Sequence, residues 1–186
     1  MTTDAAAVRA VLDHYAKLYR ARDVARLDEA IELFVPGGEP EMLGTEATER
    51  GDSDWAIGRG AVRAITEWDW RYWFDVVLDV KEARITIAGD VAWASLPGAL
   101  VQSERSREGT RCFVRQTTLT QILDLVADSE QPLEGRLTDI AYVAGSRARE
   151  LQAPAGHRRA LTLTAVLVRR DEAWRFHTTH WSLAAE

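Results

Sequence analysis

The sequence is poor in cysteine and lysine, and each shortage excludes a class of protein. Cys112 is the only cysteine among the 186 residues, which excludes an intrachain disulfide and a thiolate metal cluster. Lys17 and Lys81 are the only lysines, the arginines are scattered, and the formal net charge is −6. A nucleic-acid-binding surface is therefore not expected, because such surfaces gather positive charge on one face.

Long apolar runs and metal-ligand patterns are also missing. Asp4, Arg9 and Asp13 interrupt the N-terminal segment, which therefore lacks the charged-then-apolar pattern of a signal peptide. No apolar run approaches the length of a membrane span, and no pair of histidines with a carboxylate occurs at metal-ligand spacing. We therefore expect a cytoplasmic protein with no membrane partner, no metal and no cofactor.

The hydrophobic pattern changes its period along the chain, which predicts an α+β fold. Apolar residues recur at helical spacing near the N-terminus, with Asp23 as the expected N-cap of a second helix and a third helix over 60–73. Later segments alternate with a period of two, as in strands. Helices followed by antiparallel strands indicate α+β architecture in one domain over 1–186. The predicted strands cover residues 74–81, 83–88, 91–101, 110–117, 160–170 and 173–183, the last two joined by a turn at Asp171-Glu172.

The segment 118–159 interrupts the series of strands. It contains two apolar stripes at helical spacing, over 119–128 and 137–151, with Pro132 and Pro154 on either side of the second. We interpret it as a helical insertion between two late strands. It serves either as a lid over the pocket or as a dimerisation arm, and the sequence does not choose between these roles.

Three stretches of the chain resemble a known superfamily. They are the helical hairpin over 7–34, the segment 43–65 with its Gly-Thr, Trp and Gly-Arg positions, and the ending 163–182 with Trp174, His180 and Ser182 in a W-x5-H-x-S pattern. Together they are similar to the nuclear transport factor 2-like superfamily, and within it to the SnoaL-like proteins, which include polyketide cyclases and relatives of ketosteroid isomerase. The resemblance covers residues 5–117 and 160–184.

The resemblance implies a cone: three helices packed on a strongly curved antiparallel sheet, with a pocket opening into its concave side. It also implies frequent dimerisation through the convex face. It does not imply one activity, because the superfamily includes isomerases, cyclases, dehydratases, hydrolases and association domains.

The last strand contains two histidines, and their spacing predicts different environments. Side chains alternate along a strand, so His177 and His180 point to opposite sides and cannot share a metal unless the strand bulges between them. The even-numbered face begins apolar at Trp174 and ends polar, as expected for a face that enters a pocket. His180 is therefore the candidate pocket acid or base, with Thr178 and Ser182 as polar neighbours; the alternative is a structural histidine.

The odd-numbered face of the same strand carries Trp181 and Leu183. Both side chains would lie on the convex side of the sheet, where a partner must cover them. We therefore expect a homodimer through the outer sheet face.

Other candidate site residues come from the first helix, a loop and a strand. Tyr15 could donate a hydrogen bond to a ligand, and Tyr19 could line the same pocket; both are alternatively core tyrosines. Trp55, with nearby aromatic residues, is expected to form the pocket wall. Asp54 stands beside it in a loop that also contains Glu49 and Asp52, so this carboxyl could have a raised pKa and act as a base, or the loop could be merely solvated. Arg115, on the predicted strand over 110–117, could hold a carboxylate ligand or face solvent.

Two functions follow from these residues. The first is binding of a small, largely apolar organic molecule in the cone, with acid–base chemistry of the isomerase, cyclase or dehydratase type. The second is a non-catalytic dimeric association or ligand-sensing module. Neither hypothesis decides whether the protein is an enzyme, and the sequence does not identify the ligand.

Overall fold

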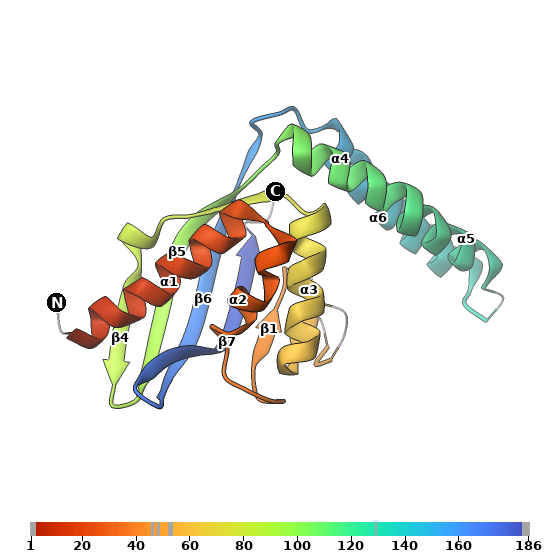
Figure 1. The fold of residues 1–186 in the computed structure, drawn as a ribbon. Helices are drawn as coiled ribbons and strands as arrows, with labels where there is room; N and C mark the ends of the chain where they lie inside the picture. Colours follow the sequence, from red (N-terminus) through yellow and green to blue (C-terminus); the bar gives the residue numbers. More distant parts are fainter. Residues whose placement is uncertain (1–2, 46, 48, 52–53, 129, 184–186) are drawn as a thin grey trace. The chain divides into compact units, whose positions relative to one another are not determined.

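The computed structural model describes residues 3–45, 47, 49–51, 54–128 and 130–183. The chain forms two compact units. The first, which we call the sheet unit, comprises Met1–Arg71, Asp75–Val101 and Arg158–Glu186; the second, the helical arm, comprises Tyr72–Phe74 and Gln102–His157. The sheet unit combines helices with a curved sheet, which confirms the predicted α+β class (Figure 1). Within the described residues, no helix is long and apolar enough to cross a membrane.

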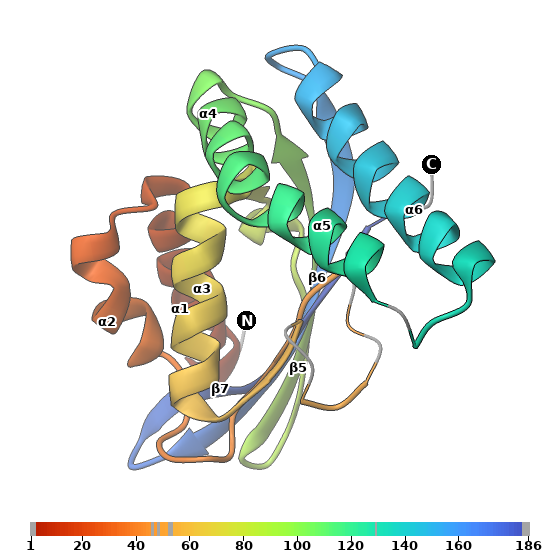
Figure 2. The same cartoon turned by 90° about the vertical axis from the view of Figure 1, so that its right-hand side faces the viewer.

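The helices of the sheet unit lie against one face of the sheet (Figures 1 and 2). The Asp23 side chain accepts a hydrogen bond from the Ala25 amide at 3.1 Å, so the predicted N-cap starts the short helical turn that leads into the second helix. The described helical elements are α1 (Thr3–Ala21), η1 (Val24–Arg26), α2 (Leu27–Ile31), α3 (Gly58–Tyr72) and η2 (Val80–Glu82).

Within the described residues, the sheet has seven strands in the order β2-β1-β7-β6-β5-β3, with β4 also paired to β5. All neighbouring strands are antiparallel except β1 and β7, which run parallel. The strands are β1 (Glu41–Leu43), β2 (Trp55–Ile57), β3 (Asp75–Leu78), β4 (Arg84–Ala88), β5 (Val91–Val101), β6 (Arg158–Arg170) and β7 (Ala173–Leu183).

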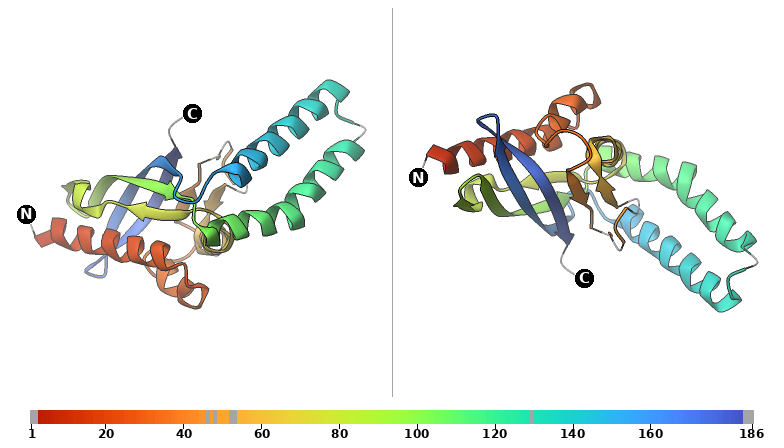
Figure 3. Two further views of the ribbon diagram at one scale, coloured as in Figure 1. Left: turned by 90° about the horizontal axis from the view of Figure 1, so that it is seen from above. Right: turned by 90° about the horizontal axis from the view of Figure 1, so that it is seen from below.

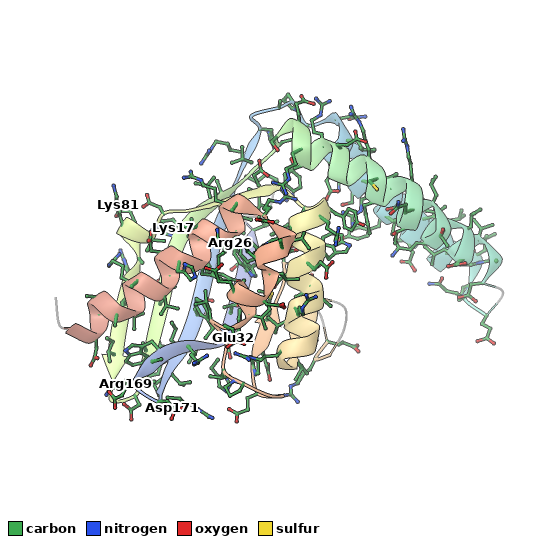
Figure 4. The ribbon with its side chains drawn as sticks, viewed as in Figure 1. Lys17, Arg26, Glu32, Lys81, Arg169 and Asp171 are labelled. Carbon is green, nitrogen blue, oxygen red and sulfur yellow. The ribbon has the colours of Figure 1, made fainter. Side chains whose placement is uncertain are left out.

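The predicted turn at Asp171-Glu172 joins β6 to β7 (Figure 4). Both residues have positive φ, at 50° and 62°, as a two-residue type I′ hairpin requires. The turn therefore continues the twist of these two strands and sets their register at this end.

A β-bulge in β7 reverses the predicted orientation of its second half. Thr178 pairs with Val166, and Phe176 pairs with Leu167, which leaves His177 as an extra residue. Because of this residue the buried positions change from even to odd numbers, so that Thr179 and Trp181 are buried and His180 is exposed. The prediction that His180 faces the interior is wrong, and so is the prediction that Trp181 lies on the outer face.

The interior of the sheet unit is packed with aromatic rings. Tyr15 of α1 contacts Tyr19, Phe34, Phe176 and Trp181, with ring centroids 4.8 to 6.1 Å apart. These rings are buried, and together they connect α1 to β7. The odd-numbered residue Trp181 thus contributes to the core rather than to a dimer contact.

The helical arm is longer than the predicted insertion. It consists of α4 (Glu104–Phe113), the π-helix η3 (Val114–Thr118), α5 (Leu119–Ala127) and α6 (Leu133–Gln152), and its two long segments run side by side in opposite directions (Figure 3). The predicted strand over 110–117 is therefore wrong. Ser103 explains the difference: its hydroxyl accepts from the Ser106 amide at 3.1 Å, while the Ser106 hydroxyl accepts from the Ser103 amide at 2.8 Å, and this capping box starts a helix.

Candidate functional site

A hydrogen bond between α1 and α3 forms the centre of the candidate site. Tyr15 and Tyr19 lie one turn apart on α1 and are both buried, as the helical stripe predicted. The Tyr19 hydroxyl donates to Oδ2 of Asp69, on α3, at 3.0 Å. The site thus brings a phenol and a carboxyl together at the edge of the aromatic interior.

Asp69 is an unusual carboxyl in this position. Burial raises its pKa from 3.8 to about 8, although the hydrogen bond from Tyr19 opposes that increase. The charge of Asp54 raises the pKa further, and the guanidinium of Arg22 lowers it. At neutral pH the carboxyl is therefore mostly protonated, and it can gain or lose a proton close to physiological pH.

The two tyrosines remain protonated. Burial is the largest cause of the raised pKa of Tyr15 and of Tyr19, and the charge of Asp69 raises the pKa of both. Each hydroxyl is therefore a hydrogen-bond donor rather than a base at any physiological pH.

Arg22 fixes the end of α3 on which Asp69 stands. Its side chain is buried; Nε donates to the Trp70 carbonyl at 3.0 Å, Nη2 donates to the Asp69 carbonyl at 3.0 Å, and Nη1 pairs with Asp75 Oδ1 at 2.5 Å. Carbonyls in the last turn of a helix have no partner within that helix, so the guanidinium satisfies two of them. Arg22 is therefore a positioning residue for Asp69.

Three buried polar atoms near this interior have no hydrogen-bond partner within the described part of the chain. They are the Tyr15 hydroxyl, the Thr179 hydroxyl and the Trp70 indole nitrogen. The hydroxyls of Tyr19 and Thr179 lie close enough to influence the pKa of Tyr15, but not in good hydrogen-bonding geometry. Buried polar groups are normally satisfied, so these atoms offer sites for a water molecule or a polar ligand group.

The loop before β2 is arranged differently from the prediction. The Trp55 indole nitrogen donates to Glu41 Oε2 at 2.9 Å, so the indole lies against the carboxylate of Glu41. The Asp54 side chain packs directly over Gly44, where a Cβ atom would overlap it. The negative charge of Asp54 raises the pKa of Asp69. Asp54 therefore acts on the carboxyl of α3, and Asp52 lies outside the described residues.

The remaining predicted site residues do not join this cluster. Thr178 and His180 line a shallow groove on the outer sheet face beside Trp93, which is 48% exposed. Ser182 shares their side of β7, and Arg115 is exposed on η3 of the helical arm. The predicted orientation of the β7 residues and the predicted strand at Arg115 were both wrong. The structure therefore brings together Tyr15, Tyr19 and the carboxylate of Asp54, but not the other candidates.

Sequence reasoning missed Asp69, Arg22 and Thr179. Asp69 stands between two tryptophans in "EWDWRYW", and a lone carboxylate among aromatic residues is a signal for a carboxyl with a raised pKa. Arg22, at the end of the apolar stripe of α1, gave no comparable signal. Its role depends on the distant α3 and β3.

Comparisons with known proteins identify the fold. No model of a protein family matches the chain, and no curated protein matches it in sequence. A proposed dehydratase of the NTF2-like (nuclear transport factor 2-like) family from Streptomyces avermitilis is similar in structure, with a TM-score of 0.61 at 11% identity over 99% of this chain and 98% of that chain.

Two further solved structures agree. An NTF2-like protein of unknown function from Pseudomonas putida KT2440 gives a TM-score of 0.57 at 13% identity, over 99% of this chain and 90% of that chain. An NTF2-like protein with a cystatin-like fold from Novosphingobium aromaticivorans gives 0.55 at 14% identity, over 97% and 81%. At these identities the similarity concerns the fold alone. The chain therefore has the NTF2-like fold, as its resemblance to that superfamily implied.

Proposed function

We propose that the sheet unit binds a small, largely apolar organic molecule beside Asp69 and Tyr19 and transfers a proton to or from it. The reaction is of the isomerase, cyclase or dehydratase type. One observation carries the proposal: a carboxyl with a pKa of about 8 receives a hydrogen bond at 3.0 Å from a buried tyrosine. A group that titrates near neutral pH can serve as both acid and base.

The neighbouring groups support this chemistry. Tyr19 holds one oxygen of the Asp69 carboxyl, which leaves the other oxygen, Oδ1, as the atom that exchanges a proton with the ligand. The unpaired hydroxyls of Tyr15 and Thr179 are donors for a ligand oxygen, and the surrounding aromatic rings favour an apolar skeleton. The Streptomyces avermitilis structure, described as a proposed dehydratase, has a name compatible with such a reaction.

The proposal assigns acid–base chemistry to Asp69 in place of His180. The imidazole of His180 is exposed on the outer face of β7, whereas the buried Tyr15 and Thr179 lie on the inner side. Tyr15 keeps its proposed role as hydrogen-bond donor.

Substitution of Asp69 by Asn tests the reaction. We expect Asp69→Asn to lower turnover by about 10²–10⁴-fold in a screen of small apolar ketones, enols and secondary alcohols, because an amide cannot exchange the proton. His180→Ala is the matched control and is expected to retain turnover. If Asp69→Asn keeps full activity on a compound that the unsubstituted protein converts, or if His180→Ala abolishes that activity, the assignment is wrong.

A second measurement examines the electrostatics directly. Carbon-13 NMR titration of the carboxyl groups is expected to find Asp69 with a pKa of about 8. The charge of Asp54 raises the pKa of Asp69, so Asp54→Asn should lower that pKa. The hydrogen bond from Tyr19 lowers the pKa of Asp69, so Tyr19→Phe should raise it. An Asp69 carboxyl that titrates near pH 4 contradicts the proposed role.

The outer sheet face favours a second candidate function, which is association without catalysis. Trp93 is half exposed there, in the groove that also contains Thr178 and His180. A homodimer through this face would cover the indole of Trp93 rather than that of Trp181. Leu183 is odd-numbered and shares the inner side of β7 with Trp181, so the prediction that it lies on the outer face is also wrong. Trp93→Glu is the variant that tests this interface.

A further inference from the structure

The outer face of the sheet carries a large exposed aromatic side chain, the indole of Trp93. Along β5 the inward positions Ala92 and Ala94 are buried, whereas Trp93 points outward and is 48% exposed. The helices of the sheet unit lie against the opposite face (Figure 2), so they leave this indole open. An exposed flat aromatic ring is a surface on which a ligand with an apolar face packs.

Strand pairing identifies the groups around the indole. Paired residues of adjacent strands project from the same face with their Cβ atoms about 5 Å apart, and diagonal neighbours are about 7–8 Å apart. Trp93 pairs with Thr86 of β4, and Ser95, two residues along β5, pairs with both Arg84 and Thr164. The indole is therefore surrounded by three hydroxyls and one guanidinium on a single face of the sheet.

These side chains line one groove, which we call the Trp93 groove. Its volume is about 490 Å³, and small-molecule sites have volumes of about 300–1,000 Å³, so it has the size of a ligand site. Thr178 and His180 extend it across β7. Within the described part of the chain, the side chains of Arg84, Ser95 and Thr164 have no hydrogen-bond or ion-pair partner, so their polar groups are available to a ligand.

The charge of the groove indicates the charge of its ligand. No carboxylate lines it among the described residues, although the chain has a formal net charge of −6. Arg84 is exposed beside the indole, and the imidazole of His180 lies at the other end. A guanidinium binds a carboxylate through two parallel hydrogen bonds, which makes an organic acid the complementary ligand.

The hydroxyls and the indole indicate the rest of the ligand. A hydroxyl both donates and accepts hydrogen bonds, so this lining matches a ligand that itself carries several hydroxyls. A pyranose ring has hydroxyls at its edge and C–H groups on its faces, and such a face packs on an indole. A second copy of the chain matches less well, because homodimer interfaces are mostly apolar and only Trp93 and Val166 are apolar among the outward side chains of this groove.

We propose that the Trp93 groove binds a hexuronate, a sugar whose sixth carbon is a carboxylate. One face of the pyranose ring packs on the indole, the carboxylate pairs with Arg84, and the ring hydroxyls bond to the hydroxyls of Ser95 and its neighbours. This site is independent of the proposed proton transfer, because it uses none of the residues around Asp69.

Nitrogen-15 NMR titration of the full chain tests the site. Glucuronate is expected to shift the indole N–H signal of Trp93, which is assigned by its absence from Trp93→Ala. Glucose differs from glucuronate only in lacking the carboxylate, so we expect it to bind at least about tenfold more weakly. Benzoate has a flat ring and a carboxylate but no hydroxyls, and we expect a similar loss of affinity.

Three variants identify the contacts, with binding followed at the Ser95 amide. Trp93→Ala is expected to lower the affinity for glucuronate at least about tenfold, and Arg84→Gln is expected to abolish the preference for glucuronate over glucose. Arg115→Gln is the matched control: it removes an exposed arginine of the helical arm and should leave the affinity unchanged. Circular dichroism of each variant verifies that the fold is intact.

Three outcomes of the titration overturn the proposal: the Trp93 signal does not respond to glucuronate, glucose or benzoate binds as tightly as glucuronate, or Arg84→Gln retains the preference. The homodimer considered above would occupy the same surface, so sedimentation velocity of the unsubstituted chain and of Trp93→Glu is measured beside the titration. An assembly that Trp93→Glu dissociates and that glucuronate leaves intact would place a second copy of the chain, rather than a sugar, in the groove.

Discussion

Replacing Arg22 by Leu is expected to lower the free energy of unfolding by about 3–5 kcal/mol, because it removes one partner of a buried ion pair and two hydrogen bonds to helix carbonyls. The side chain is only 2% exposed and holds the carbonyls of Asp69 and Trp70 together with the carboxylate of Asp75. The leucine cannot donate to any of them, so the last turn of α3 loses its anchor. Urea unfolding followed by circular dichroism measures the loss.

Two control variants separate the guanidinium from the charge. Arg22→Lys keeps the positive charge but not the planar fork, so we expect an intermediate loss of stability. Arg20→Ala, two residues earlier on the exposed side of α1, is expected to change stability by less than about 0.5 kcal/mol. An Arg22→Leu protein within about 1 kcal/mol of the unsubstituted one would show that Arg22 is not the anchor.

Replacing Asp69 by Asn is expected to stabilise the protein in a pH-dependent way. The pKa of Asp69 is about 8 in the folded protein and 3.8 without the fold, so between these values the folded state holds a proton that the unfolded state releases. The stabilisation from this proton is complete below pH 4 and is lost as the pH rises to 8. Asparagine stays neutral in both states and has no such loss.

The difference between the two proteins should therefore grow with pH. Each pH unit within this window corresponds to at most about 1.4 kcal/mol, and because Asp69 retains some contact with solvent we expect a total gain of about 2–4 kcal/mol at pH 8 and little at pH 4. Unfolding in urea at pH 4.5, 6, 7 and 8 measures it, with Asp79→Asn as an exposed control. A constant difference across this range would contradict the raised pKa.

The expected gain has a functional meaning. A side chain that costs stability at neutral pH and serves a reaction is an example of the trade-off between stability and activity. Asp69→Asn should therefore be the more stable and the less active protein. A carboxyl whose pKa is lowered in the folded protein would instead lose stability on the same substitution.

The sequence predicted the fold more accurately than the site. Helical periodicity placed Tyr15 and Tyr19 on the buried side of α1, and alternation located both strands of the last hairpin and its turn. These features depend on neighbours within a few residues along the chain. They can therefore be read from local patterns.

The predicted side-chain orientation in the second half of β7 was wrong, and the residues of the strand itself show the reason. Trp174 and Phe176 are even-numbered, whereas Trp181 is odd-numbered, so the strand can bury all three aromatic side chains only if one residue between them bulges. His177 is that residue. Continuous alternation was the simpler assumption, and it placed His180 on the wrong face.

By itself, the sequence determined the α+β class, the last β-hairpin with its turn, and the burial of the two tyrosines of α1. Only the tertiary structure decided that Asp69 has a raised pKa, since its environment comes from Tyr19, 50 residues away, and from Asp54 in a separate loop. Only the structure showed that leucines of α5 and α6 are exposed. The physical reason is the same in each case: burial and pKa depend on which distant segments pack together, whereas periodicity depends on neighbours along the chain.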